Sequence, residues 1–183
     1  MTLEIRPHAT HRGPGRHPFG AAIHFWRGLF GAGLAVGMAL GLQAETLIPT
    51  GAQWRWRPGT NEASAPITAW RSPAFSDAQF VSARAPFWFG DALTGGTQIS
   101  GMQNVYGSLF LRRAFVVSQP GELAGLRLGA LVDDGFVAWI NGIEVLRVNV
   151  PGASGDPVST GTLADNAVEP VAFTQYALPN PAG

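Results

Sequence analysis

Residues Leu131–Arg147 read LVDDGFVAWINGIEVLR, and Asn141-Gly142 lies between two apolar runs within them. Asn-Gly between strand-like runs is the strongest short-range hairpin signal, because both central residues of a type I′ turn need a positive φ. We therefore predict a β-hairpin with strands over Phe136–Ile140 and Ile143–Val148. The preceding Asp133-Asp134-Gly135 is predicted to be the turn that leads into it.

The two-residue loop also predicts which residues of the hairpin face each other. The expected pairs are Ile140–Ile143, Ala138–Val145 and Phe136–Arg147 on one face, and Trp139–Glu144 and Val137–Leu146 on the other. Both faces are largely apolar. This pattern favours a strand pair inside a sandwich over an exposed ribbon.

The adjacent acids Asp133 and Asp134 are the first candidate site. One hypothesis is architectural, with Asp133 accepting hydrogen bonds from backbone amides of the turn, as in Asx turns. The alternative is calcium, which prefers several carboxylate and carbonyl oxygens; two neighbouring acids supply too few ligands alone. A glycosidase pair is disfavoured, because its two carboxylates must face one substrate from about 5–9.5 Å apart.

Residues 1–44 are predicted to be a signal peptide. A leader rich in Pro, His and Gly carries Arg6, Arg12, Arg16 and Arg27, and a charge-free apolar segment follows over Gly28–Ala44. This order, with a small residue before the expected cleavage after Ala44, is typical of secretion to the cell surface or beyond. An uncleaved anchor is the alternative, although the segment is shorter than the roughly 20 residues of a membrane span.

Removal of this leader limits the chemistry of the remaining chain, residues 45–183. All four histidines precede Ala44, and the whole sequence has no cysteine and no lysine. Ser-His-Asp and Cys-His triads, zinc sites with His or Cys ligands and Schiff-base lysines are therefore excluded from residues 45–183. No basic stripe is present to neutralise phosphates, which argues against nucleic acid as a partner. After cleavage, no membrane association is expected either.

The remaining chain has the pattern of an all-β protein. Short apolar runs alternate with Gly- and Pro-rich turns, and no 3.6-residue period persists. Besides the hairpin, the predicted strands are Ala52–Arg57, Phe87–Phe89, Ser108–Val117 and Leu123–Val132. A short turn of helix is predicted to begin at Ser76-Asp77, and residues 151–183 are predicted to be loop.

Several of these pieces, in the same order, resemble the galactose-binding-like β-sandwich module of large secreted bacterial proteins. They are LIPTGAQWRWR, AWRSPAFSDAQF, APFWFGDA, SLFLRRAFVV and the DDG…NG hairpin, and together they span roughly Leu47–Gly152. The module is similar in form to the sugar-binding domain of family 2 glycoside hydrolases. Trp88 stands where it usually has tyrosine. The resemblance implies an antiparallel jelly roll over residues 45–183 that ends before the module's last strand.

The resemblance also implies a function for the domain, a non-catalytic accessory module of a secreted protein that binds carbohydrate. Its candidate ligand contacts are Trp88, Asp91, Asp133 and Asp134. No cofactor is expected apart from the calcium alternative, and the domains of a longer protein would be its other partners. Two alternatives remain open: a structural spacer or interaction domain without a ligand, and the front piece of a larger extracellular hydrolase.

The tryptophans bear on this choice, because indole rings stack on sugars as well as filling cores. Trp54, Trp56 and Trp70 fall where the module has core aromatics, so we predict that they are packed inside. The adjacent Arg112 and Arg113 are predicted to point to opposite faces of one strand and to form ion pairs there.

Overall fold

The computed structural model describes residues 2–7, 44–90, 93–120 and 123–179. In these residues the chain is all-β, and its sheets are antiparallel apart from one short parallel pair, as predicted. The arrangement is consistent with a β-sandwich. The only helical element described is a single 3₁₀ turn, η1, at Ala69–Arg71.

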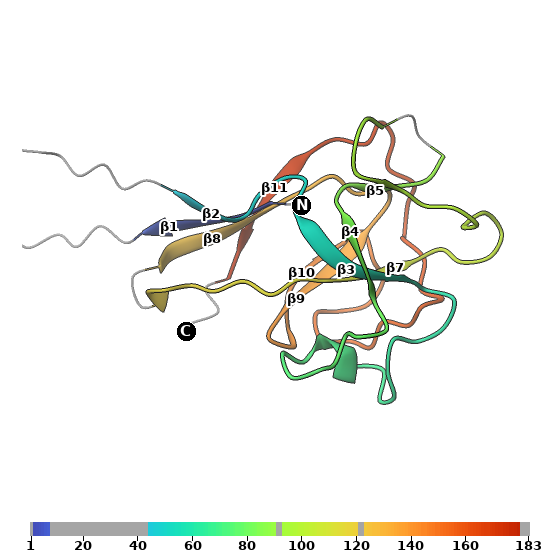
Figure 1. Cartoon of the computed structure of the whole chain (residues 1–183), viewed down its shortest axis with the longest axis horizontal. Coiled ribbons are helices and arrows are strands. Elements are labelled where there is room, and N and C mark those ends of the chain that lie inside the picture. Colours follow the sequence, from blue (N-terminus) through green and yellow to red (C-terminus); the bar gives the residue numbers. More distant parts are fainter. Residues whose placement is uncertain (1, 8–43, 91–92, 121–122, 180–183) are drawn as a thin grey trace, which may run out of the picture.

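The largest sheet has four strands in the order β11-β8-β1-β2. They are β1 (Thr2–Pro7), β2 (Glu45–Ile48), β8 (Leu123–Ala130) and β11 (Thr174–Leu178). Figure 1 shows β1 lying between β2 and β8 on the left of the molecule. Strands from the two ends of the described chain therefore share one sheet.

The other strands form three smaller units. A three-stranded sheet has the order β4-β3-β7, with β3 at Gln53–Pro58, β4 at Val81–Arg84 and β7 at Leu109–Arg112. The short strands β5 (Phe87–Trp88) and β6 (Thr97–Gln98) are the parallel pair. The hairpin is β9 (Phe136–Ile140) and β10 (Ile143–Val148), with the predicted bounds.

The main core is formed jointly by these sheets. Ile48, Leu126, Leu128 and Leu178 of the four-stranded sheet are buried in one cluster with Trp54 of β3 and Val145 of β10. A second cluster contains Ala63, Trp70 and Phe80, with Phe75, Phe110 and Trp139 packed against it. The predicted core positions of Trp54 and Trp70 are thus confirmed, while Trp56 is half-buried and packs on Phe87.

The register of the hairpin corrects the prediction in its second half. Ile140–Ile143 and Trp139–Glu144 pair as predicted, but Leu146 then lies opposite Ala138 and Arg147 opposite Val137. Val145 is an extra residue in β10, a β-bulge that shifts all later pairs by one position. Two-residue turn geometry fixes the start of a register and gives no information on a bulge further along.

Three other sequence predictions are wrong in extent or place. β7 ends at Arg112 rather than Val117, because the Arg113 guanidinium donates to the Gln53 carbonyl at the point where the ladder with β3 would continue. The short helical turn lies at η1 and not at Ser76-Asp77, because both acceptors of the Asp77 carboxylate face arginines instead of capping amides. Residues 151–183, predicted to be loop, include β11.

The signal-peptide prediction falls largely on residues 8–43, which lie outside the described part of the chain. Among the described residues, no helix has the length and apolar character required to span a membrane.

Candidate functional site

The DDG turn anchors a distant loop. Asp134 Oδ1 accepts a hydrogen bond from the Val168 backbone N–H at 2.8 Å, and the Asp134 carbonyl accepts one from Asn149 Nδ2 at 3.1 Å. The Asn149 carbonyl in turn accepts from the Asp165 N–H at 3.0 Å. The turn therefore holds residues 165–168 beside the start of β9 and the end of β10.

Gly135 is required in this turn by the close approach of a second backbone segment. A Cβ at position 135 would lie 2.6 Å from the Asn149 carbonyl oxygen and 2.9 Å from that of Val148. Such contacts leave no room for any side chain. The glycine of the DDG motif thus lets the turn pack directly on the end of β10.

The loop and the sheet enclose a shallow pocket of about 100 Å³ beside Asp134. Its lining residues come from β8, the β8–β9 turn, β9, β10, the loop before β11 and β11: Ala130, Val132, Asp134, Phe136, Val148, Val168, Pro170, Ala172, Thr174 and Tyr176. The Phe136 and Tyr176 rings pack edge to face with centroids 5.6 Å apart. The lining is mostly apolar, and its polar side chains are those of Asp134, Thr174 and Tyr176.

Two polar groups of this pocket keep unused hydrogen-bonding capacity. Asp134 uses Oδ1 for the Val168 amide, and its Oδ2 has no hydrogen-bond partner within the described ranges. The Tyr176 hydroxyl likewise has none in the same part of the chain. A carboxylate oxygen and a phenol beside aromatic rings can accept and donate hydrogen bonds to a polyol while the rings contact its carbon face.

The sequence-predicted ligand contacts do not all come together. Asp133 and Asp134 share the turn, but Trp88 lies in β5 and does not line the Asp134 pocket. Trp88 is half-buried, and its indole N–H donates to the Gly95 carbonyl at 3.0 Å. The neighbouring Phe89 is exposed and Phe87 packs on the core. Asp91 lies outside the described residues.

A metal centre would need more ligands than the DDG turn brings together. Within residues 2–7, 44–90, 93–120 and 123–179, no three carboxylate or imidazole side chains converge. Calcium usually takes six to eight oxygen ligands. The described residues around Asp134 form a hydrogen-bonded anchor.

Arg112 is the last residue of β7 and Arg113 follows it, and the two side chains have different partners. Arg112 donates to the backbone carbonyls of Trp70, Ser72 and Phe75, and its guanidinium lies 5.2 Å from the centroid of the Phe75 ring. Arg113 is exposed and donates to the Gln53 carbonyl. Arg112 thus holds the loop after η1 in place by hydrogen bonds to its backbone carbonyls.

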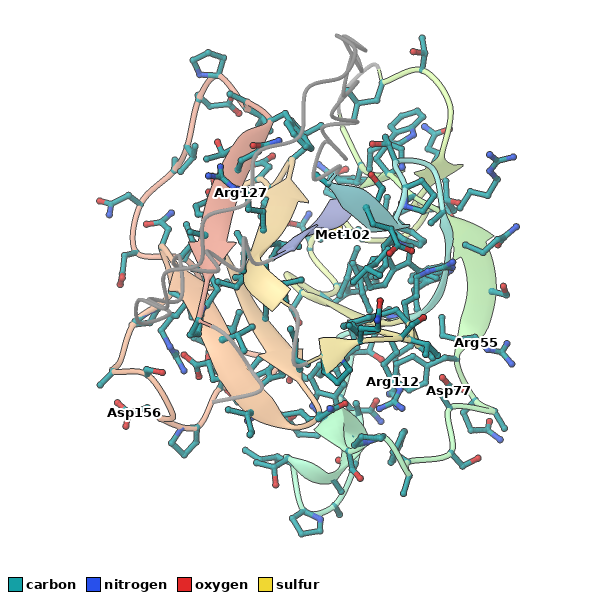
Figure 2. All side chains as sticks on the ribbon, turned by 90° about the vertical axis from the view of Figure 1, so that its left-hand side faces the viewer. Arg55, Asp77, Met102, Arg112, Arg127 and Asp156 are labelled. Atoms are coloured by element: carbon teal, nitrogen blue, oxygen red, sulfur yellow. The ribbon has the colours of Figure 1, made fainter. Side chains whose placement is uncertain are left out.

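Asp77 completes this arginine cluster. Its carboxylate lies 3.5 Å from Arg112 Nε and 3.7 Å from Arg55 Nε, and Figure 2 shows the three side chains together at the lower right. Arg55 also donates to the Phe80 carbonyl at 3.2 Å. The donors are directed at the protein's own backbone and at one carboxylate, so the cluster is structural.

A second ion pair holds the loop after β10. Glu144 and Arg147 form two hydrogen bonds of 2.8 and 2.9 Å, and both side chains are nearly fully buried. Arg147 also donates to the carbonyls of Pro151 and Asp156, and Glu144 accepts from the Gly155 N–H. Hydrogen bonding to Arg147 lowers the pKa of Glu144, and the same bonds raise the pKa of Arg147.

Arg71 covers the nearby end of the aromatic cluster. Its guanidinium lies 4.2 Å from the centroid of the Trp139 ring, and burial lowers the pKa of Arg71. Trp139 in turn packs edge to face on Trp70, with centroids 5.5 Å apart. The Trp139 ring is therefore covered on one face by the Arg71 guanidinium, and that face is unavailable for stacking on a sugar.

Sequence analysis missed the aromatic part of the Asp134 pocket. The sequence pattern places Tyr176 in a predicted loop and Phe136 in the predicted hairpin, with no site role for either. The signal for β11 is present, because Thr174, Tyr176 and Leu178 alternate with polar or small residues. With β11 placed beside β8, Tyr176 reaches Phe136.

The comparisons with known proteins give no match: no family model matches the chain, and searches of the curated proteins and of the solved structures found no match either.

Proposed function

We propose that this chain is a non-catalytic, carbohydrate-binding accessory module of a secreted protein, of galactose-binding-like jelly-roll form. The observation that carries the proposal is the Asp134 pocket, where a carboxylate with an unused oxygen lies beside the rings of Phe136 and Tyr176. Sugar-binding sites combine an aromatic surface with a few fixed polar groups, because sugars have both C–H faces and hydroxyls.

The size of the pocket favours the end of a glycan. Pockets for drug-sized ligands span about 300–1,000 Å³, whereas this one has about 100 Å³. One terminal sugar, inserted by one edge, is the ligand that such a pocket accommodates. The free Asp134 Oδ2 would accept from a sugar hydroxyl, and the Tyr176 hydroxyl would pair with a second one.

The residue inventory supports a binding role without catalysis in residues 45–183. That part of the chain has no His, Cys or Lys, and the nearest acid to Asp134 in sequence, Asp133, belongs to the same turn. A catalytic domain of a larger hydrolase would then lie elsewhere in a longer protein. Export through a leader cleaved at Ala44 is part of the proposal.

A structural spacer is the second candidate, and one observation favours it. Trp54, Trp70 and Trp139 are packed in the two apolar clusters, so most of the indole surface is used for the fold. A spacer needs no exposed aromatic ring for ligand binding. In that case Tyr176 and Trp88 would have no ligand-binding role.

The experiment that separates these candidates is a glycan array together with pull-downs on insoluble polysaccharides. The full chain is expressed in an exporting bacterial host, and its N-terminus is determined by mass spectrometry. Each binding assay is run with calcium and with a chelator. Binding in both conditions is expected, because the pocket groups need no cation; a folded, exported protein that binds no glycan would leave the spacer.

A further inference from the structure

The strand β1 fills a slot between two strands that do not pair with each other. It is antiparallel to β8 on one side and to β2 on the other. β11 already covers the far edge of β8, and β2 pairs with no described strand except β1. Without β1, β8 would have one open edge, and β2 would have no neighbour among the described strands.

The walls of this slot belong to the main core. Leu126 and Leu128 of β8 are each 3% exposed, and Ile48 of β2 is 4% exposed, with β1 in place. Ile5 lies at the register position opposite Leu126, and Leu3 lies opposite both Leu128 and Ile48. An empty slot would expose an apolar row and unpaired backbone groups, the combination that promotes strand addition.

The register also sets a charge preference. Glu4 lies at the position opposite Arg127 of β8, between the positions of Leu3 and Ile5. Figure 2 shows Arg127 at the four-stranded sheet, far from the cluster of Arg55, Arg112 and Asp77. A strand with an acid between two apolar residues therefore matches the slot in both polarity and charge.

We propose that the slot between β2 and β8 is a strand-acceptor site for a donor strand of a partner polypeptide, with the pattern apolar–acidic–apolar. Residues Thr2–Pro7 are its resident occupant. The existence of the slot does not depend on the function proposed above. Its being empty after processing does, because it requires the proposed removal of residues 1–44, which include β1. Export would then leave the slot open, and a donor strand could pair with both β2 and β8 in antiparallel orientation.

The test uses the full chain with a protease site introduced into residues 8–43. The folded protein is cut there, which leaves β1 as a separate peptide, and fluorescently labelled MTLEIRPH (residues 1–8) is added. The proposal expects the labelled peptide to exchange into the cut protein, measured by fluorescence anisotropy. A peptide with the Leu3→Asp and Ile5→Asp substitutions is expected to bind at least about 100-fold more weakly, because charged residues then replace apolar ones at the register positions opposite Leu128 and Leu126.

A charge-swap pair tests the charge preference at the position opposite Arg127 in the same assay. A Glu4→Arg peptide is expected to bind the wild-type protein about threefold more weakly, and to recover on an Arg127→Glu protein. Size-exclusion chromatography with light scattering follows the assembly. A monomer with bound peptide is expected; a dimer would show that a second copy supplies the strand, which overturns a separate partner.

Two results concern the released fragment. The β1 fragment could dissociate after cleavage, and the protein could then lose its cooperative unfolding transition. If MTLEIRPH restores that transition and the doubly substituted peptide does not, the result supports the strand-acceptor site. If the fragment leaves without any change in melting temperature, and neither peptide binds, the slot is not an acceptor. Neither result involves a sugar, so failure here is distinct from failure of carbohydrate binding.

Discussion

Glu144 and Arg147 are three residues apart in one β-strand, yet their side chains form a doubly hydrogen-bonded ion pair on the same face. Regular strand geometry would place them on opposite faces, because side chains alternate. The bulge at Val145 removes this alternation: Glu144 pairs with Trp139 and Arg147 with Val137, two positions on one face of β9. The extra residue therefore creates the ion pair that holds the loop after β10.

Replacing Glu144 by Gln is expected to destabilise the protein by about 3 kcal/mol at neutral pH, because a buried Arg147 loses its charge partner. The folded-state pKa of Glu144 lies below its ordinary value of 4.5. The pair's contribution is thus fully present above about pH 4.5 and lost as the pH falls through the folded-state pKa. Urea denaturation from pH 7 downward measures this.

The control for this prediction is Glu169→Gln, which changes an exposed acid in the same way. Its free energy of unfolding should stay within about 0.5 kcal/mol of the wild-type value at neutral pH. For Glu144→Gln, the difference in free energy of unfolding from wild type should shrink at acid pH. If that difference stays constant below pH 4.5, the result argues against the ion pair.

Arg112, the last residue of β7, and Arg113, which follows it, are expected to respond differently to the same substitution. Arg112→Lys removes the fork that reaches three carbonyls and Asp77, and we expect a loss of about 2 kcal/mol. Arg113→Lys changes an exposed side chain with one carbonyl partner, and a loss below about 0.5 kcal/mol is expected. Chemical denaturation of both variants checks this, and equal losses would contradict the structural role of Arg112.

Gly135 and Gly125 form a second matched pair. Gly135→Ala would place a methyl group against two backbone carbonyls, so we expect a loss of about 2 kcal/mol or more. Gly125→Ala meets no atom within 4 Å and needs no left-handed backbone. It is expected to be neutral or stabilising by up to about 1 kcal/mol. Thermal unfolding of the two variants gives the comparison; a neutral Gly135 variant would mean that the turn lies farther from β10.

Short-range sequence patterns correctly predicted the elements whose structure is set by neighbouring residues. The Asn-Gly turn predicted both hairpin strands with their bounds, because turn geometry is set by the residues within it. The core positions of Trp54 and Trp70 were also predicted. The all-β class followed from short apolar runs between turn residues.

Features set by distant contacts could not be predicted in the same way. The bulge at Val145 accompanies the Glu144–Arg147 ion pair, which is hydrogen-bonded to the loop at 151–156, and the hairpin turn does not indicate it. β11 has a short alternating pattern within a segment of loop composition, and it becomes a strand by pairing with β8. The Asp134 pocket needs both β9 and β11, so sequence alone could propose the carboxylate but not its aromatic neighbours.

The measurement that tests the carbohydrate proposal most directly is a glycan array probed in parallel with the wild-type chain and three variants. Asp134→Asn keeps the Oδ1 acceptor for Val168 and replaces the free Oδ2 by an amide, and Tyr176→Phe removes only a hydroxyl. Trp88→Ala alters the other predicted contact, and circular dichroism verifies that each variant folds.

We expect the wild type to bind glycans through a terminal sugar, with at least about tenfold weaker binding for the Asp134 and Tyr176 variants, since lost hydrogen bonds to a charged or fixed partner are worth about 1.5 kcal/mol or more. The Trp88 variant should bind as the wild type does. A folded wild-type chain that binds no glycan, or binding lost only in the Trp88 variant, would contradict the Asp134 pocket as the site.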